Sequence, residues 1–406
     1  MRVRLGRRRL LASVILAAGL SSGLPAAAAD KRYDEGASDT EVKIGQTLAY
    51  SGPASYSGVV GRIQSAYFEQ LNQRGGINGR KVNLISLDDG YSPPKTVEAT
   101  RRLIEGEGVL FTFNSMGTAT QSAVQKYLNA KKIPQLMVSS GASRWNQPDK
   151  FPWSTPGVPL YSTEGRVFAR WLLNNKPDAK VAILSQNDDL GRDFVSNFRE
   201  VLGDKAATMI VSEATYDATD PTLDSQLVKL SNSGADVFFN VTVGKFASQS
   251  IKKVAELGWK PLQYMMSASA SGMMIKAAGP ENAKGLIAIQ SNKRVGSPRW
   301  HDDAEVQAYQ AFRAKYVPTV DPADDTGFYA YSGAVLLSEV LRRCGDDLTR
   351  ANLLKQATDL KGMRTPYLLP GLTLAVTATD YEPVTTFYMG RYTGQDWELS
   401  EHTIAD

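Results

Sequence analysis

Val42-Lys43-Ile44-Gly45-Gln46-Thr47-Leu48 is a run of β-branched and apolar residues that predicts a β-strand. Residues 59–74 follow it with apolar side chains at helical spacing, and Gly75-Gly76 ends this expected helix. Asn78-Gly79 then turns the chain into a second strand over residues 82–87. A strand, a helix and a strand in this order predict parallel strands that are covered by helices.

The same alternation continues along the chain and predicts two α/β units in tandem. In the first unit we expect helices over 94–105 and 119–130 and strands over 109–113 and 135–138. A second unit begins after Pro156 and Pro159. Its expected strands cover 180–184, 209–213, 236–241 and 262–266, and its expected helices cover 163–174, 192–202, 221–230 and 247–257.

The predicted fold is therefore α/β, with two doubly wound, Rossmann-like lobes that are joined by a multi-strand hinge. We expect residues 41–157 and 287–375 to form the N-terminal lobe, which takes the three helical stretches after residue 300. Residues 158–286 and 376–406 form the C-terminal lobe, which the tail strands close. The chain exceeds the roughly 250–300 residues at which one hydrophobic core stops growing, so two cores are expected.

The amino end predicts a cleavable signal peptide over residues 1–29. Arg2, Arg4 and Arg7-Arg8-Arg9 precede an apolar run that is too short to span a membrane, and a run of alanines follows at 26–29. The paired arginines fit a twin-arginine signal, and an ordinary Sec signal also begins with basic residues. We therefore expect export to the periplasm by one of these two routes.

Removal of this segment changes the charge of the chain. The formal net charge of +4 falls to +4 − 5 = −1, because the segment holds five arginines and no acid. The charge of the mature chain then gives no reason to expect a nucleic-acid partner. We also expect the protein to be a monomer. The single cysteine, Cys344, has no partner in the chain for a disulfide and is expected to be a buried, inert thiol.

No enzyme signature stands out. The two histidines, His301 and His402, lie away from the expected strand ends, and the sequence lacks a phosphate-binding loop, a dinucleotide fingerprint, a nucleophile elbow and zinc-ligand spacing. We predict no catalytic residue, no metal site and no cofactor. Asp88 and Asp89 could suggest an acid/base or metal pair, but the turn that follows them favours structural capping.

Five segments resemble the periplasmic leucine/isoleucine/valine-binding proteins of ABC importers, and they occur in the expected order. They are Lys43-Ile44-Gly45 with Ser51-Gly52-Pro53, Gly75-Gly76-Ile77-Asn78-Gly79-Arg80, Leu87-Asp88-Asp89-Gly90-Tyr91-Ser92-Pro93, Ser139-Ser140-Gly141-Ala142-Ser143 and Gln186-Asn187-Asp188-Asp189-Leu190-Gly191-Arg192. The resemblance implies that a solute lies between two closing lobes and that the closed form docks on a membrane permease with its ATPase.

The resemblance also implies a set of ligand-binding residues at the carboxyl ends of the strands. Ser115 would receive a ligand carboxylate, with Gly141 and Ser143 in the next loop, and Tyr56 would form an aromatic wall. Both serines could instead cap helices, and Arg144 could pair with a carboxylate or lie on the rim. The other candidates are Asn114, Ala142, Tyr161, Asp188, Thr242, Val243 and Ala268.

The second lobe departs from the family pattern. Where amino-acid binders place a tyrosine and a glutamate for the ligand ammonium, this chain has Thr242 or Val243 and then Ala268. A buried ammonium without a carboxylate partner is costly. We therefore expect a small carboxylate with an aromatic or branched apolar body, as in the branch of the family that binds aromatic carboxylates. An ordinary branched-chain amino acid, and a sensor that presents its ligand to a membrane receptor, remain the alternatives.

Overall fold

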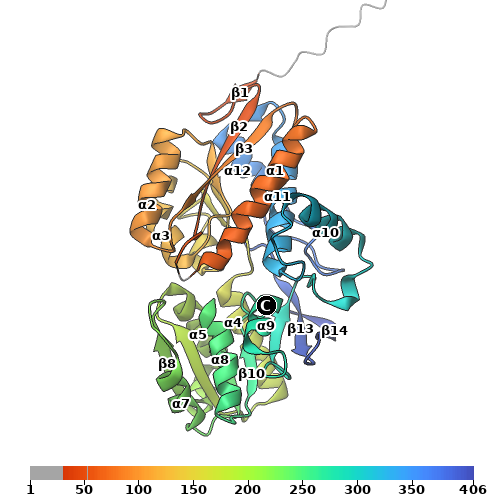
Figure 1. Ribbon diagram of the computed structural model, residues 1–406. Coiled ribbons are helices and arrows are strands. Elements are labelled where there is room, and N and C mark those ends of the chain that lie inside the picture. Colours follow the sequence, from red (N-terminus) through yellow and green to blue (C-terminus); the bar gives the residue numbers. More distant parts are fainter. Residues whose placement is uncertain (1–30, 53) are drawn as a thin grey trace, which may run out of the picture.

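The computed structural model describes residues 31–52 and 54–406, and Figure 1 shows them as two lobes, one above the other. The expected signal peptide lies outside the described residues. In the part of the chain that is described, no helix is both long and apolar enough to cross a membrane. The expected fold class, two α/β lobes, is confirmed.

The N-terminal lobe is built on a five-stranded parallel sheet in the order β3-β2-β4-β5-β6. Its central strands are largely buried, as parallel strands between helices require, whereas the edge strand β3 is only partly buried. The strands are β2 (Glu41–Leu48), β3 (Lys81–Asp88), β4 (Phe111–Phe113), β5 (Gln135–Val138) and β6 (Ser154–Pro156). The helices of this lobe are α1 (Gly58–Gln73), α2 (Pro93–Arg101), α3 (Thr118–Ala130), α10 (Ala304–Tyr316), α11 (Asp325–Cys344) and α12 (Arg350–Ala357).

The C-terminal lobe holds a seven-stranded sheet in the order β14-β13-β11-β10-β9-β7-β8, in which β13 is antiparallel to both of its neighbours, β11 and β14. The strands are β7 (Val181–Gln186), β8 (Ile210–Tyr216), β9 (Val237–Val241), β10 (Leu262–Met265), β11 (Ile287–Gln290), β13 (Thr386–Tyr392) and β14 (Trp397–Ala405). The helices are α4 (Tyr161–Asn175), α5 (Asp189–Leu202), α6 (Ala206–Met209), α7 (Asp224–Ser231), α8 (Lys245–Glu256) and α9 (Gly272–Ala278).

Strand β11 corrects one expected lobe boundary. Residues 287–290 were assigned to the N-terminal lobe, but β11 pairs with β10 on one side and with β13 on the other. The second segment of the N-terminal lobe therefore begins after Gln290. The chain passes between the lobes in the connections from β6 to α4, from β11 to α10 and from α12 to β13.

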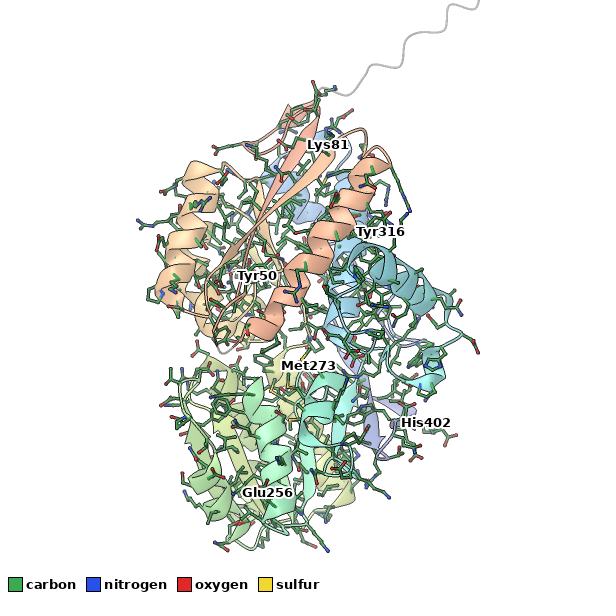
Figure 2. All side chains as sticks on the ribbon, in the orientation of Figure 1. Tyr50, Lys81, Glu256, Met273, Tyr316 and His402 are labelled. Atoms are coloured by element: carbon green, nitrogen blue, oxygen red, sulfur yellow. The ribbon has the colours of Figure 1, made fainter. Side chains whose placement is uncertain are left out.

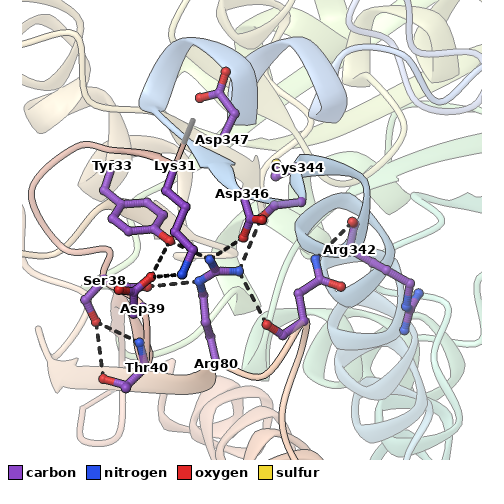
Figure 3. Close-up of polar contacts among 12 residues, drawn as sticks. Lys31, Tyr33, Ser38, Asp39, Thr40, Arg80, Arg342, Cys344, Asp346 and Asp347 are labelled. Carbon is purple, nitrogen blue, oxygen red and sulfur yellow. Dashed lines mark hydrogen bonds and ion pairs between the residues drawn. The ribbon is translucent and has the colours of Figure 1, made fainter. Parts of the chain in front are cut away.

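The leader of the described chain is fixed to the far end of the N-terminal lobe by Arg80 (Figure 3). Its guanidinium donates to the Tyr33 hydroxyl at 2.6 Å and to the carboxylate of Asp346 at 2.5 Å. The strands β1 (Arg32–Tyr33) and β12 (Asp347–Leu348) pair beside it. Cys344, at the end of α11, is buried as expected, and burial raises the pKa of its thiol to about 12.

Candidate functional site

A cavity of about 260 Å³ lies between the two lobes. Residues from both lobes line it. Many of them follow the carboxyl ends of the strands, where ligands of such sheets are expected, and others come from α4, α11 and the connection from α12 to β13. Aromatic side chains and neutral polar groups dominate the part between the lobes. These are Tyr56, Tyr91, Asn114, Thr118, Ser139, Tyr161, Ser267, Ser269, Ser271, Asn292 and Tyr367.

The amino end of α3 lies beside this cavity and leaves backbone donors free. Gly117, the residue before the helix, has no side chain that could cap it, and its φ of 109° lies in the region that favours glycine. The N–H groups of Thr118, Ala119 and Thr120 have no acceptor among the described residues. Gly117 and Thr118 both line the cavity. A helix start of this kind favours an anion, because the free N–H groups and the helix dipole both carry partial positive charge.

Tyrosines surround the same space. Tyr56 comes from the loop after β2 and faces Gly244 of the other lobe, where a side chain carbon would lie 3.3 Å from its ring. Burial raises the pKa of Tyr56 to about 12, and it also raises the pKa of Tyr91 and Tyr161. These hydroxyls therefore stay protonated at neutral pH and can donate to an oxyanion without adding a charge.

Tyr329 is held in position by Asn114. The Asn114 amide donates to the Tyr329 hydroxyl at 2.6 Å and to the carbonyl of Met137 at 2.8 Å, and its oxygen accepts from Gln64 at 2.8 Å. All of these groups are buried or half-buried. Asn114 therefore acts in the cavity wall mainly by fixing Tyr329.

Glu164 is an acidic residue in the cavity wall that the sequence reasoning missed. It lies in the first turn of α4 and is 2% exposed. Its carboxylate accepts from the Tyr264 hydroxyl at 2.9 Å, and from the Ser267 N–H and hydroxyl at 2.6 and 2.7 Å. Burial nevertheless raises the pKa of Glu164 to about 7. The Glu164 carboxyl group is therefore about half protonated near neutral pH.

Arg294 is a second charged residue that the sequence reasoning missed. Its side chain is 11% exposed and lines the cavity beside Asp325, with 3.4 Å between the ion-pair atoms. Its guanidinium also donates to the side-chain oxygen of Gln290 at 2.9 and 3.1 Å. The strand-end rule would have selected this loop if residues 287–290 had been assigned to the sheet of the second lobe.

The structure brings five of the predicted site residues together around the cavity. Tyr56, Asn114, Tyr161, Val243 and Ala268 all line it, and they come from both lobes. Their contact with a solute stays a prediction. Val243 and Ala268 carry no acidic group, but the carboxylate of Glu164 lies beside the loop of Ala268, where it accepts from the Ser267 N–H.

Three other predicted residues lie outside the cavity wall. The Ser115 hydroxyl accepts from the Thr47 N–H at 3.0 Å inside the lobe, and the residue before α3 is Gly117, two residues further along the chain. The Thr242 hydroxyl donates to Asn240 at 2.6 Å and is fully buried. Asp188 caps α5 by accepting from the N–H groups of Leu190 and Gly191.

The loop at 141–143 contacts the other lobe instead of lining the cavity. The carbonyl of Gly141 accepts from the Tyr161 N–H at 2.7 Å, and Ala142 is buried in the core. The N–H and hydroxyl of Ser143 donate to the carboxylate of Asp193 on α5, at 2.6 and 2.9 Å. This loop therefore joins the two lobes. The backbone donors that the N-terminal lobe offers to an anion lie instead at the start of α3.

The remaining charged candidates have structural roles. Asp88 accepts from the Ser51 hydroxyl and from the N–H groups of Tyr50, Ser51 and Gly90, and these hydrogen bonds lower the pKa of Asp88 to about 2. Asp89 accepts from the Tyr91 N–H and the Thr96 hydroxyl, so both aspartates hold their loops in place, but neither caps α2, whose N-cap residue is Ser92. Arg144 lies outside the cavity lining and pairs with Asp189 at 3.2 Å. Both histidines are exposed, and Figure 2 shows His402 on the tail strand β14.

Comparison with known proteins agrees with this architecture. A model of the periplasmic binding protein family matches residues 41–396. The Leu/Ile/Val-binding protein homolog 3 of Brucella melitensis is 24% identical over 335 residues, which cover 80% of this chain and 85% of that protein.

Two solved structures resemble the fold closely. A branched chain amino acid ABC transporter protein from Thermus thermophilus with bound valine has a TM-score of 0.81 at 16% identity, over 91% of this chain and 97% of that one. A solute-binding protein of an ABC transporter from Rhodopseudomonas palustris, in complex with benzoate, has a TM-score of 0.74 at 22% identity, over 90% and 98% of the two chains. At these identities the likeness establishes the fold.

Proposed function

The chain belongs to the periplasmic binding protein family, and from this premise we propose that it binds a small carboxylate without an ammonium group between its two lobes. The proteins that it matches are solute-binding proteins of the branched-chain amino acid type, not enzymes. We further propose that it works in the periplasm after removal of residues 1–29, by the Sec or the twin-arginine route. Its partners there would be an ABC permease and ATPase in the inner membrane.

The observation that carries this proposal is the free amino end of α3 beside a ring of tyrosines. The N–H groups of Thr118, Ala119 and Thr120 supply donors, and protonated tyrosines supply further donors and an apolar wall. Such neutral donors suit a carboxylate, since they add no second charge that closure would have to desolvate. The benzoate complex of the Rhodopseudomonas palustris protein shows that this fold accepts an aromatic acid.

Glu164 favours one alternative ligand, a branched-chain amino acid. Its carboxylate lies in the cavity wall and could receive an ammonium group in its ionised form. The name of the Brucella melitensis relative and the valine in the Thermus thermophilus structure support the same alternative. Against it, the three donors that Glu164 already accepts and its pKa of about 7 make it a weak partner for a cation at neutral pH.

A thermal-shift screen tests the proposal across three classes of compound: benzoate-type acids, aliphatic acids and α-amino acids. A ligand at 100 times its Kd adds about 2.7 kcal/mol to the free energy of unfolding, so a true ligand raises the melting temperature. We expect acids without an ammonium group to give the largest shifts. Shifts with leucine or valine and none with either class of simple acid would contradict the proposal in favour of the alternative.

Replacing Gly117 by alanine should weaken carboxylate binding about tenfold or more, because it displaces the charge-assisted donors at α3. A Cβ atom at Gly117 would clash with the Thr120 hydroxyl and lie 2.7 Å from the Tyr91 ring, so the first turn must move. Calorimetric titration with an acid from the screen measures the loss.

The matched control for this variant is Gly234→Ala. Gly234 also has a positive φ, 75°, but a Cβ there meets no atom within 4 Å, and the residue lies outside the cavity wall. Both variants should lose about 1–3 kcal/mol of stability to backbone strain. Equal affinity in Gly117→Ala and Gly234→Ala would show that the carboxylate does not bind at α3.

A further inference from the structure

The cavity continues beyond the cleft and runs into the N-terminal lobe along one face of α11. The lining positions on this helix, Asp325, Thr326, Tyr329, Ser332, Gly333 and Leu336, are spaced by three and four residues, as one helical face requires. Eleven residues of helix separate the first from the last, which corresponds to about 16 Å. In Figure 1, α11 runs from the junction of the lobes into the upper lobe, so the cavity follows the same direction.

The character of the wall changes along this path. At the start of α11 the cavity touches the charged pair Arg294 and Asp325. At its far end it is enclosed by a set of apolar side chains that we call the rear chamber: Met137, Leu336, Ala357, Leu360, Leu374, Val376 and Val384. These residues come from β5, α11, the end of α12 and the connection from α12 to β13, which passes between the lobes.

Tyr329 and Tyr367 line the passage from one part to the other. Tyr329 and Tyr367 stand edge to face at 5.9 Å between ring centres, and Asn114 fixes the Tyr329 hydroxyl. All three residues line the cavity. The passage therefore offers polar groups to the cleft and ring surface to whatever enters the rear chamber.

Protein interiors are normally filled, and an unfilled apolar space costs free energy in proportion to its volume. Leu336 is only partly buried, whereas the chamber residues from α12 and from the connection between α12 and β13 belong to the hydrophobic core. Part of the Leu336 side chain therefore faces the open space of the cavity. Thr365 of the same connection also lines the cavity, but the seven side chains of the rear chamber are apolar, so apolar matter is its natural content.

We propose that the rear chamber receives an unbranched apolar arm of the ligand, so that the solute is an elongated carboxylate with an alkyl or alkyl-aryl tail. This inference rests on the proposed function for the position of the carboxylate, at α3. The carboxylate occupies the cleft, the tail lies along the surface of the Tyr329 and Tyr367 pair, and its end lies against Leu336, Leu360 and Val376.

Calorimetric titration with straight-chain carboxylates from acetate to decanoate, and with the matching primary alcohols, tests the chamber. Each methylene that enters an apolar site contributes about 0.8 kcal/mol, so affinity should rise about threefold to fourfold per carbon until the chamber is full. Affinity that stays flat beyond four carbons would overturn the chamber and leave the proposed function intact. Length dependence in the alcohols, without any preference for the acids, would support the chamber and contradict the carboxylate proposal.

Two variants of one residue decide whether the tail lies where we place it. Leu336→Phe extends a partly buried side chain into the chamber, and it should lower the affinity for octanoate at least tenfold while leaving the affinity for butyrate unchanged. Leu336→Ala enlarges the chamber and should shift the maximum of the series to a longer acid. The control is Val228→Phe at a position that is 42% exposed in the other lobe. The same length dependence in all three variants would overturn the proposal.

Discussion

Replacing Glu164 by glutamine should raise the free energy of unfolding by up to about 3 kcal/mol at pH 8 and change it little at pH 4. Burial raises the pKa of Glu164 from 4.5 to about 7, so the folded chain keeps a proton that the unfolded chain releases. The stability of the native chain therefore falls as pH rises from about 4.5 to 7. Glutamine carries no such proton, and its amide can still accept from Tyr264 and Ser267.

Urea unfolding of Glu164→Gln and of the native chain at several pH values measures this difference. The exposed Glu200→Gln serves as the control, because it removes the same charge from the outer face of α5 without a buried carboxyl group. The difference for Glu164→Gln should grow between pH 4.5 and 7 and then stay constant. A difference that is independent of pH would show that Glu164 is ionised in the folded chain throughout this range.

The second large effect concerns the aromatic core of the C-terminal lobe, which holds α4 and thus Glu164 and Tyr161 in place. Phe168 is fully buried and stacks on Tyr264 with 3.8 Å between ring centres. It also lies within 5.1 Å of Phe239 and 5.5 Å of Phe198, measured between ring centres. We expect Phe168→Ala to lower the free energy of unfolding by about 3–5 kcal/mol, because it leaves a cavity among rigid rings.

Chemical denaturation of Phe168→Ala beside Val228→Ala checks this expectation. Val228 is exposed on α7, so its truncation should change stability by at most about 0.5 kcal/mol. A loss below 1 kcal/mol for Phe168→Ala would mean that the lobe collapses around the missing ring. The packing of α4 on β9 and β10 would then have a smaller part in positioning the site than the structure indicates.

Much of the fold could be predicted from the sequence, because the alternation of strands and helices is local. The unit from β2 to β3 follows directly from the spacing of apolar residues and from Gly75-Gly76. The assignment of residues 287–290 was wrong because lobe membership depends on pairing with β13, which lies about a hundred residues later. The short helix α9 was missed, since seven residues carry too little periodicity to stand out from a loop.

The site was less predictable, because its chemistry depends on offsets of a few residues. Strand-end reasoning selected the loop that holds both Ser115 and Thr118, but only the start of α3 decides which of them meets the cavity. Glu164 could not be found this way, since it comes from a helix and contacts Ser267, 103 residues later in the chain. Local patterns specify which loops converge, and tertiary contacts specify which side chains remain available to a ligand.

The central claim is that the cleft binds a carboxylate that carries no ammonium group. Calorimetric titration with matched pairs tests it most directly: 4-methylpentanoate against leucine, and 3-phenylpropanoate against phenylalanine. Each pair shares its carboxylate and its apolar body and differs in the α-ammonium. The account predicts that the simple acid of at least one pair binds at least tenfold more tightly than its amino acid at pH 7. Tighter binding of the amino acid in both pairs would contradict it and would identify Glu164 as the partner of an ammonium group.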